Sequence, residues 1–193
     1  MLTFEPTTHR YTYAGQRVPG VSEIIRDAGL MPDLSFLDPW YLERGTRVHE
    51  ATELYDAGDL DEASIDPAIA GYVDGWRRFR ADAGDRLQIT GVEVQGHHAG
   101  YGYAGRADRL GTWDAADAVV DAKCGKPDRW HGLQLAAYAH LWVPSATVRL
   151  GVYLAKDGTY KLERYADRAD WPVFQAACSL WHWRAAHNLL PKE

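Results

Sequence analysis

The chain has very little cysteine: only Cys124 and Cys178 occur among its 193 residues. The two lie far apart in the sequence, and neither has a partner at Cys-x-x-Cys spacing. This scarcity argues against a disulfide framework of the kind found in small secreted domains, and against a zinc site built from cysteine pairs. We expect both residues to be buried thiols.

Long apolar runs are also missing. No segment approaches the roughly eighteen consecutive apolar residues that a membrane-spanning helix needs. The first residues, MLTFEPTTHR, lack the basic and apolar regions of a signal peptide. We therefore expect a cytoplasmic protein that makes no contact with membranes.

An excess of positive charge is the third absence. The formal net charge is −6, whereas proteins that hold nucleic acid mainly through their surface field are usually basic. This charge argues against tight, nonspecific binding of duplexes. Net charge is a sum over the whole surface, however, so a local basic lining stays open, with four candidate residues: Arg106, Arg109, Lys126 and Arg129.

The chain does have the size and apolar content of one globular domain, with 193 residues of which 46% are hydrophobic. No internal repeat, low-complexity tract or long linker divides it. We expect a single domain over residues 1–193. Within it, residues 1–85 would form an N-terminal hairpin and helices, and residues 86–193 would form a sheet with flanking helices.

Hydrophobic periodicity and turn residues place the individual elements. We expect a hairpin across Thr7 and Thr8, then a short helix capped by Ser22, and a final helix capped by Asp170. The helices beyond Ser22 are expected at 39–55, 67–84, 128–142 and 170–188. The strands are expected at 87–94, 101–110, 118–124, 147–155 and 159–165. This pattern indicates an α/β fold whose core reads α, β, β, β, α, β.

The segment from Gly105 to Tyr138 contains the residues best suited to chemistry. In a strand, Asp121 and Lys123 project to the same face because residues i and i+2 do so. Asp108 lies thirteen residues before Asp121, and the turn-rich sequence GTWDAAD between them allows a hairpin that brings the two acids together. Two adjacent carboxylates repel unless a cation neutralises them, and oxygen ligands suit Mg²⁺ or Mn²⁺ better than zinc.

These residues belong to an ordered set of motifs that resembles the PD-(D/E)XK nuclease superfamily, and particularly its RecB-like exonuclease branch, which includes CRISPR-associated, phage and mitochondrial exonucleases. Any one motif is weak, but their order is hard to obtain by chance. The motifs are Gly45 to His49, Glu93, Gly105 to Asp108, Asp121 to Lys123, and Gln134 to Tyr138. The resemblance implies a restriction-endonuclease-like core with a mixed central sheet, flanking helices and an N-terminal elaboration. Four-cysteine iron–sulfur clusters occur in some members, and two cysteines cannot supply one.

The resemblance also implies a role for each matched residue. Asp108 and Asp121 would hold one or two Mg²⁺ or Mn²⁺ ions, His49 would be a further metal ligand, and Lys123 would orient or activate the attacking water. The alternatives are ordinary: the acids could be strand-edge residues paired with arginines, Lys123 a partner of Asp121, and His49 a structural histidine. Glu93 is counted with the catalytic residues, although its strand could equally turn it toward solvent.

Gln134 and Tyr138 lie four residues apart on one helix face. The resemblance implies that this pair lines the site and contacts either DNA or the catalytic lysine. The competing interpretation is a surface glutamine beside a packed tyrosine.

The function that follows is a divalent-metal-dependent deoxyribonuclease that hydrolyses phosphodiester bonds at DNA ends, in recombination, repair or phage DNA processing. Its partner would be DNA, with single-stranded or end-containing substrates favoured, and a recombination or replication protein is a further candidate partner. Two alternatives stay open. One is a structure-specific endonuclease, and the other is a catalytically silent nuclease-like module that binds DNA or protein. The motifs encode neither strand preference nor oligomeric state.

Overall fold

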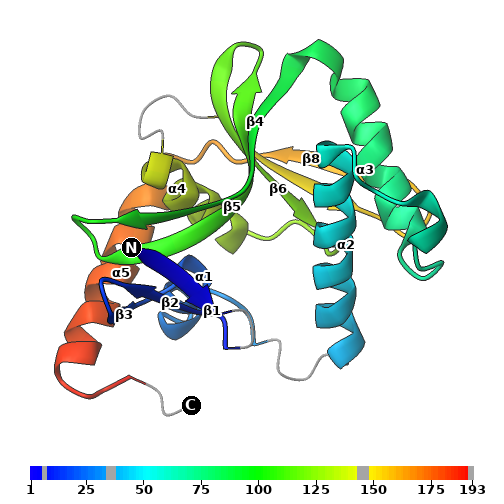
Figure 1. The fold of residues 1–193 in the computed structure, drawn as a ribbon. Helices are drawn as coiled ribbons and strands as arrows, with labels where there is room; N and C mark the ends of the chain where they lie inside the picture. Colours follow the sequence, from blue (N-terminus) through cyan, green and yellow to red (C-terminus); the bar gives the residue numbers. More distant parts are fainter. Residues whose placement is uncertain (6–7, 34–37, 143–147, 191–193) are drawn as a thin grey trace.

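The computed structural model describes residues 1–5, 8–33, 38–142 and 148–190. Two predicted features reach outside these ranges, namely Thr7 in the N-terminal hairpin and Thr147 at the start of a strand. The fold is α/β, with a five-stranded mixed sheet between helices and a small antiparallel sheet at the N-terminus (Figure 1). Within the described residues, no helix has the length and apolar content needed to cross a bilayer.

The N-terminal sheet has three antiparallel strands, one more than the predicted hairpin. They are β1 (Leu2–Glu5), β2 (Arg10–Tyr13) and β3 (Gln16–Val18). Ala14 and Gly15 join β2 to β3, and both have positive φ angles, of 50° and 80°. Such a pair is typical of the two-residue hairpin turn whose twist matches that of the strands.

Three α-helices precede the central sheet: α1 (Val21–Asp27), α2 (Pro39–Ala57) and α3 (Ala70–Ala83). Helix α2 begins where the Asp38 side chain accepts a hydrogen bond from Trp40 N, and it ends at Gly58, whose φ is 76°. Helix α1 corrects one prediction, because Gly20 and not Ser22 is its N-cap. Single-turn 3₁₀ helices lie at Glu62–Ser64 and Gly84–Arg86.

The central sheet has the order β4-β5-β6-β7-β8. Only β6 and β7 are parallel, because the chain crosses between them through helix α4, as a parallel connection requires. The bounds are β4 (Leu87–His98), β5 (Tyr103–Trp113), β6 (Ala116–Lys123), α4 (Trp130–Trp142), β7 (Val148–Leu154), β8 (Tyr160–Arg164) and α5 (Asp170–Ala186). The predicted core order of α, β, β, β, α, β is confirmed. The predicted N-cap of the last helix is also wrong. Ala169 is the N-cap of α5, and Asp170 is its first helical residue.

Each face of the central sheet has its own hydrophobic core. Helices α2 and α3 cover one face, where Trp76 and Phe79 pack with Val120 and Val152. Helices α1, α4 and α5 cover the other face, where Ile24, Leu135 and Phe174 pack with Val119. Alternate residues of β6 therefore serve opposite cores. This two-sided burial fixes the strand whose C-terminal end carries Asp121 and Lys123.

Candidate functional site

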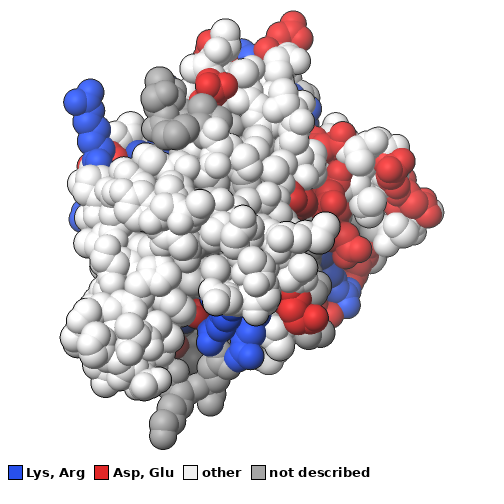
Figure 2. Space-filling model, turned by 60° about the vertical axis from the view of Figure 1, so that its left-hand side comes forward, with Lys and Arg blue, Asp and Glu red and all other residues white. Residues whose placement is uncertain are grey.

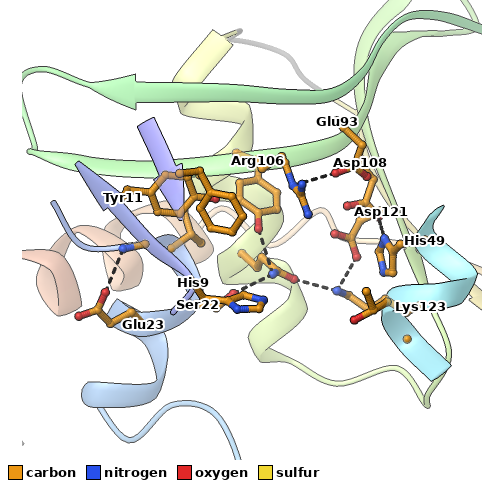
Figure 3. Close-up of a pocket in the computed structure, with 18 of the residues that line it drawn as sticks. His9, Tyr11, Ser22, Glu23, His49, Glu93, Arg106, Asp108, Asp121 and Lys123 are labelled. Carbon is orange, nitrogen blue, oxygen red and sulfur yellow. Dashed lines mark hydrogen bonds and ion pairs between the residues drawn. The ribbon is translucent and has the colours of Figure 1, made fainter. Parts of the chain in front are cut away.

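A pocket of about 870 Å³ contains every residue that the motifs single out. Its walls come from the N-terminal sheet, α1, α2, α4 and the strands β4, β5 and β6 (Figure 3). The predicted site residues that line it are His49, Glu93, Asp108, Asp121, Lys123, Gln134 and Tyr138. Segments that are far apart in the sequence thus bring these side chains to one place.

Asp108 lies where the ladder between β5 and β6 stops. The paired register runs from Trp113 opposite Ala116 to Arg109 opposite Val120 and goes no further. Beyond that pair, the amide of Ala122 donates a hydrogen bond of 2.9 Å to Asp108 Oδ2 in place of a backbone carbonyl. A buried amide needs such an acceptor, so the parting of the two strands itself orients the carboxylate.

Asp121 and Lys123 project together from β6, as their i and i+2 spacing predicts. The Nζ of Lys123 contacts Asp121 Oδ2 and donates a hydrogen bond of 2.8 Å to Gln134 Oε1. Gln134 Nε2 in turn donates to Ser22 Oγ at 3.1 Å and to Tyr138 Oη at 3.2 Å. Helices α1 and α4 therefore hold the lysine through one glutamine, and in this structure Gln134 contacts the lysine.

His49 comes from the middle of α2. Its Nδ1 lies 3.1 Å from Asp108 Oδ2. Glycine at position 45, one turn earlier, also lines the pocket and has open space around the position that a Cβ would take. The helix thus places an imidazole beside the buried carboxylate, and no close approach of another backbone to Gly45 is present among the described residues.

Glu93 occupies an unusual position in β4. Its φ is 50°, in the left-handed region that non-glycine residues rarely adopt, and the ladder to β5 passes from Val92 to Val94 without pairing it. The carboxylate is largely buried, and Arg106 Nε lies 2.8 Å from Oε2. Among the described residues no hydrogen-bond partner is found for Oε1, and Arg109 Nη1 lies 3.8 Å from it.

Electrostatic interactions shift the pKa values of three acids in the pocket, Glu93, Asp108 and Asp121, in different directions. Burial raises the pKa of Asp121, and repulsion from Asp108 adds to the rise. Burial and Asp108 likewise raise the pKa of Glu93 to about 7. Burial acts on Asp108 in the same direction, but pairing with His49 outweighs it and lowers its pKa to about 2. Burial opposes a charge on His49, and Asp108 overcomes this and raises the pKa of the imidazole.

The donor set fits a hard divalent cation. One ligand atom from each of His49, Glu93 and Asp108 lies within 4.8 Å of the others. Two carboxylates and an imidazole are ligands that Mn²⁺ accepts readily, and Mg²⁺ prefers the oxygens. The unbonded, buried Oε1 of Glu93 is the kind of atom that a cation would satisfy. This group differs from the predicted ligands, because Glu93 takes part in it while Asp121 contacts Lys123.

The predicted basic lining is only partly present. Arg106 lines the pocket, and Lys126 and Arg129 are exposed outside it. Arg109 does not fit that role, because it is 1% exposed and pairs with Asp56 at 2.6 Å. Its guanidinium lies over the ring of Trp76 in α3, with Cζ 5.1 Å from the ring centroid. Figure 2 shows acidic side chains gathered along one side of the molecule, and basic ones in separate small groups.

Several pocket residues have no signal in the motifs. Ser22 and the aromatic residues of the N-terminal sheet line the same cavity. Ser22 reaches the pocket because α1 packs beside α4, a tertiary contact that no local pattern records. Cys178 is buried as predicted, whereas Cys124 is only half-buried.

Comparisons with known proteins add little. No protein-family model matches the sequence, and no curated protein matches it either. Among solved structures, one described as "Crystal structure of SSO0001" aligns with a TM-score of 0.35 and 17% identity, over 83% of this chain and 84% of the other. Inference about function therefore depends on the geometry of the site.

Proposed function

We propose that this protein is a divalent-metal-dependent deoxyribonuclease of the PD-(D/E)XK type, acting as an exonuclease on DNA ends. One observation carries the proposal: two buried acids and a lysine from adjacent strands meet a histidine and a third acid in one pocket. Acids buried in apolar strands without a role are uncommon, because ionised carboxylates are costly to bury. Recombination, repair or phage DNA processing are the settings in which such an activity is used.

His49, Glu93 and Asp108 would hold the ion, and Asp121 would complete the site from β6. When bound, Mg²⁺ or Mn²⁺ polarises a scissile phosphate and lowers the pKa of an attacking water. Asp121 and Gln134 hold Lys123 Nζ at the edge of this group. From there the ammonium stabilises negative charge that develops on the phosphate, and it orients the water. Tyr138 accepts a hydrogen bond from Gln134 and lines the pocket in which the DNA strand would lie.

The test is a time course on end-labelled linear DNA, single- and double-stranded, with Mg²⁺, Mn²⁺ or EDTA. We expect metal-dependent release of label that falls by about 100-fold or more in Asp121→Asn and in Lys123→Ala, since each removes a charge at the reacting centre. Two matched controls are Asp117→Asn, on the same strand, and Lys161→Ala, an exposed lysine of β8. Both should cut like the wild type.

Circular DNA separates the exonuclease from the endonuclease, because an exonuclease leaves both single-stranded and duplex circles uncut. Cleaved circles would support the structure-specific endonuclease. Full activity in both site variants would overturn the mechanism. Binding without cleavage under either ion would indicate a silent DNA-binding module.

A further inference from the structure

The N-terminal sheet contributes aromatic rings to the wall of the same pocket. Phe4 of β1 and Tyr11 of β2 pack with ring centroids 4.7 Å apart. His9, just before β2, meets Phe4 edge-on at 5.8 Å and an angle of 87°. His9 is exposed and lines the pocket, whereas Tyr11 is buried behind it. In the close-up, Tyr11 and His9 lie on the side away from His49 (Figure 3).

The backbone at His9 is in the left-handed region, with φ at 51°. In a non-glycine residue this conformation costs free energy, and it persists only where the surrounding structure fixes it. The buried Tyr11 and the half-buried Phe4 lie on the paired strands β2 and β1. Their packing fixes the backbone near His9, whose imidazole lines the cavity. An exposed ring in such a place is available for contact with a ligand.

Arg106 connects this aromatic wall to the carboxylate group. Its Nε pairs with Glu93 at 2.8 Å, and the same guanidinium lies over the ring of Phe4 with its Cζ 5.3 Å from the centroid. No hydrogen bond from the two terminal amino groups is found within the described chain, and the side chain is 42% exposed. Those amino groups match the geometry of a phosphate.

The opposite wall of the pocket is acidic. Glu50 and Glu53 line it from α2, the helix that carries His49. A duplex carries two phosphate backbones, and a second backbone entering here would be brought against these carboxylates. A single strand places one backbone beside Arg106 and turns its bases toward the aromatic wall. The distribution of charge therefore favours unpaired nucleic acid.

We propose that Phe4, His9 and Arg106 form a subsite that holds one unpaired nucleotide beside the carboxylate group, with its base stacked on His9, the edge of the base against Phe4, and its phosphate on Arg106. The subsite rests on the proposed function and defines its substrate class as single-stranded DNA or a frayed end. Stacking on aromatic side chains tolerates any base, because every base has a π-face. The site selects for an unpaired strand and not for sequence.

The test compares binding of a fluorescein-labelled single-stranded oligonucleotide and a blunt hairpin duplex, measured by anisotropy with Ca²⁺ in place of Mg²⁺. A gel checks that each oligonucleotide stays intact. We use His9→Asn because asparagine tolerates the left-handed backbone while removing the ring, and Phe4→Leu because leucine keeps apolar bulk. The matched control is His97→Asn, because His97 stacks on Tyr13 at 3.9 Å and lies outside the pocket lining.

We expect the wild type to prefer the single strand. His9→Asn should raise its dissociation constant by about fivefold or more, which is the lower end of base–aromatic stacking. Phe4→Leu should raise it in the same direction, because it removes the ring against which His9 packs. Neither should change binding of the hairpin, and His97→Asn should bind both as the wild type does. Arg106→Gln should make the salt dependence of single-strand binding shallower by about 0.7 in slope, for one lost phosphate contact.

Failure of the subsite and failure of the nuclease give different results. If the wild type cuts DNA but the two ring variants bind and cut single strands normally, the subsite is wrong and the nuclease stands. If no ion supports cleavage but the ring variants lose single-strand binding, the nuclease is wrong and the subsite stands. A preference of the wild type for the hairpin, or no binding to either probe, overturns the subsite.

Discussion

Glu93 combines a strained backbone with a buried carboxylate. Its backbone is left-handed inside a strand, a conformation that costs about 1–2 kcal/mol for an L-residue. Its carboxylate is buried near Asp108, and these surroundings raise its pKa to about 7. Neither feature helps the metal-free fold. Both are explained if the strand turns this carboxylate toward a cation shared with His49 and Asp108.

Glu93→Gln should therefore stabilise the metal-free protein at pH 8 by on the order of 1 kcal/mol, while weakening Mn²⁺ binding. A pKa raised from 4.5 to about 7 means that stability is fully present below pH 4.5 and is lost as the pH rises through 7. Glutamine cannot ionise, so its advantage should appear at pH 8 and vanish near pH 4. Urea unfolding in EDTA measures the first effect, and calorimetric titration with Mn²⁺ the second. A less stable variant at pH 8 would contradict this account.

At the scale of elements, sequence patterns predicted what is local and periodic. Helix α3 follows from its amphipathic spacing, and the buried Trp76 and Phe79 lie where that spacing puts them. Strand β3 has only three residues, too few to show alternation. Strand β4 continues past Val94 to His98 through the polar sequence QGHH, because β5 pairs with it. Tertiary pairing decides such segments, and no local pattern records it.

The residues of the candidate site likewise include some that local sequence patterns predict and others that depend on tertiary pairing. Asp121 and Lys123 share a face because of strand geometry, and the hairpin turn brings Asp108 beside them, so both could be predicted. The left-handed backbone of Glu93 could not be predicted, since it depends on how β4 is paired. The pairing of Arg109 with Asp56 is equally invisible, because it joins residues that are 53 positions apart.

Asp56 links three elements in the core beside the site. It lies near the end of α2, and it is 2.6 Å from Arg109 of β5 and 3.0 Å from Arg80 of α3. It also accepts a hydrogen bond from Trp76 Nε1 at 3.1 Å. Arg109 in turn donates to the carbonyl of Asp108 at 2.8 Å. The network therefore ties α2, which carries His49, to β5, which carries Asp108.

Asp56→Asn should destabilise the protein by about 3–5 kcal/mol, because it leaves the fully buried guanidinium of Arg109 without its counter-charge. The matched control is Asp114→Asn, which removes an exposed partner of Arg86, with side chains 55% and 57% exposed. That control should cost less than about 1 kcal/mol. Chemical denaturation of both variants at neutral pH measures the difference, and similar small losses in the two would show that the buried pair is not needed.

At the scale of the whole molecule, the crossover from β6 through α4 to β7 connects the candidate site to the two hydrophobic cores. The chain leaves β6 after Lys123, forms α4 and returns as β7, parallel to β6. At the start of α4, His131 is buried and its Nδ1 accepts a hydrogen bond from Asp128 N at 3.1 Å. The same nitrogen lies 2.6 Å from the hydroxyl of Tyr153 in β7. Tyr165 contacts Tyr153 and donates to the carbonyl of Asp128. His131 Nδ1 therefore connects the start of α4 to strand β7 of the central sheet.

His131 should make global stability depend on pH. Burial, and to a lesser extent Lys123, lower its pKa from 6.5 to about 3. Between these values the unfolded chain takes up a proton that the folded protein excludes, so stability is lost as the pH falls from 6.5 toward 3. The slope from this residue approaches about 1.4 kcal/mol per pH unit. Acidic groups also contribute to the pH dependence of stability. The contribution of His131 must therefore be measured as the difference between the wild type and a variant that lacks this histidine.

His131→Asn isolates that slope, because the amide oxygen of asparagine can accept as Nδ1 does but takes up no proton in this range. Urea unfolding at pH 6.5, 5.5 and 4.5, starting at the ordinary pKa of 6.5 for histidine, should show the wild type losing stability faster than the variant. The two curves should therefore converge or cross on acidification, even if the variant is weaker at pH 6.5. His187→Asn, an exposed histidine after α5, controls for the substitution itself and should follow the wild type. Parallel curves for wild type and His131→Asn would mean that His131 is protonated in the fold and that the contact with Tyr153 is formed differently.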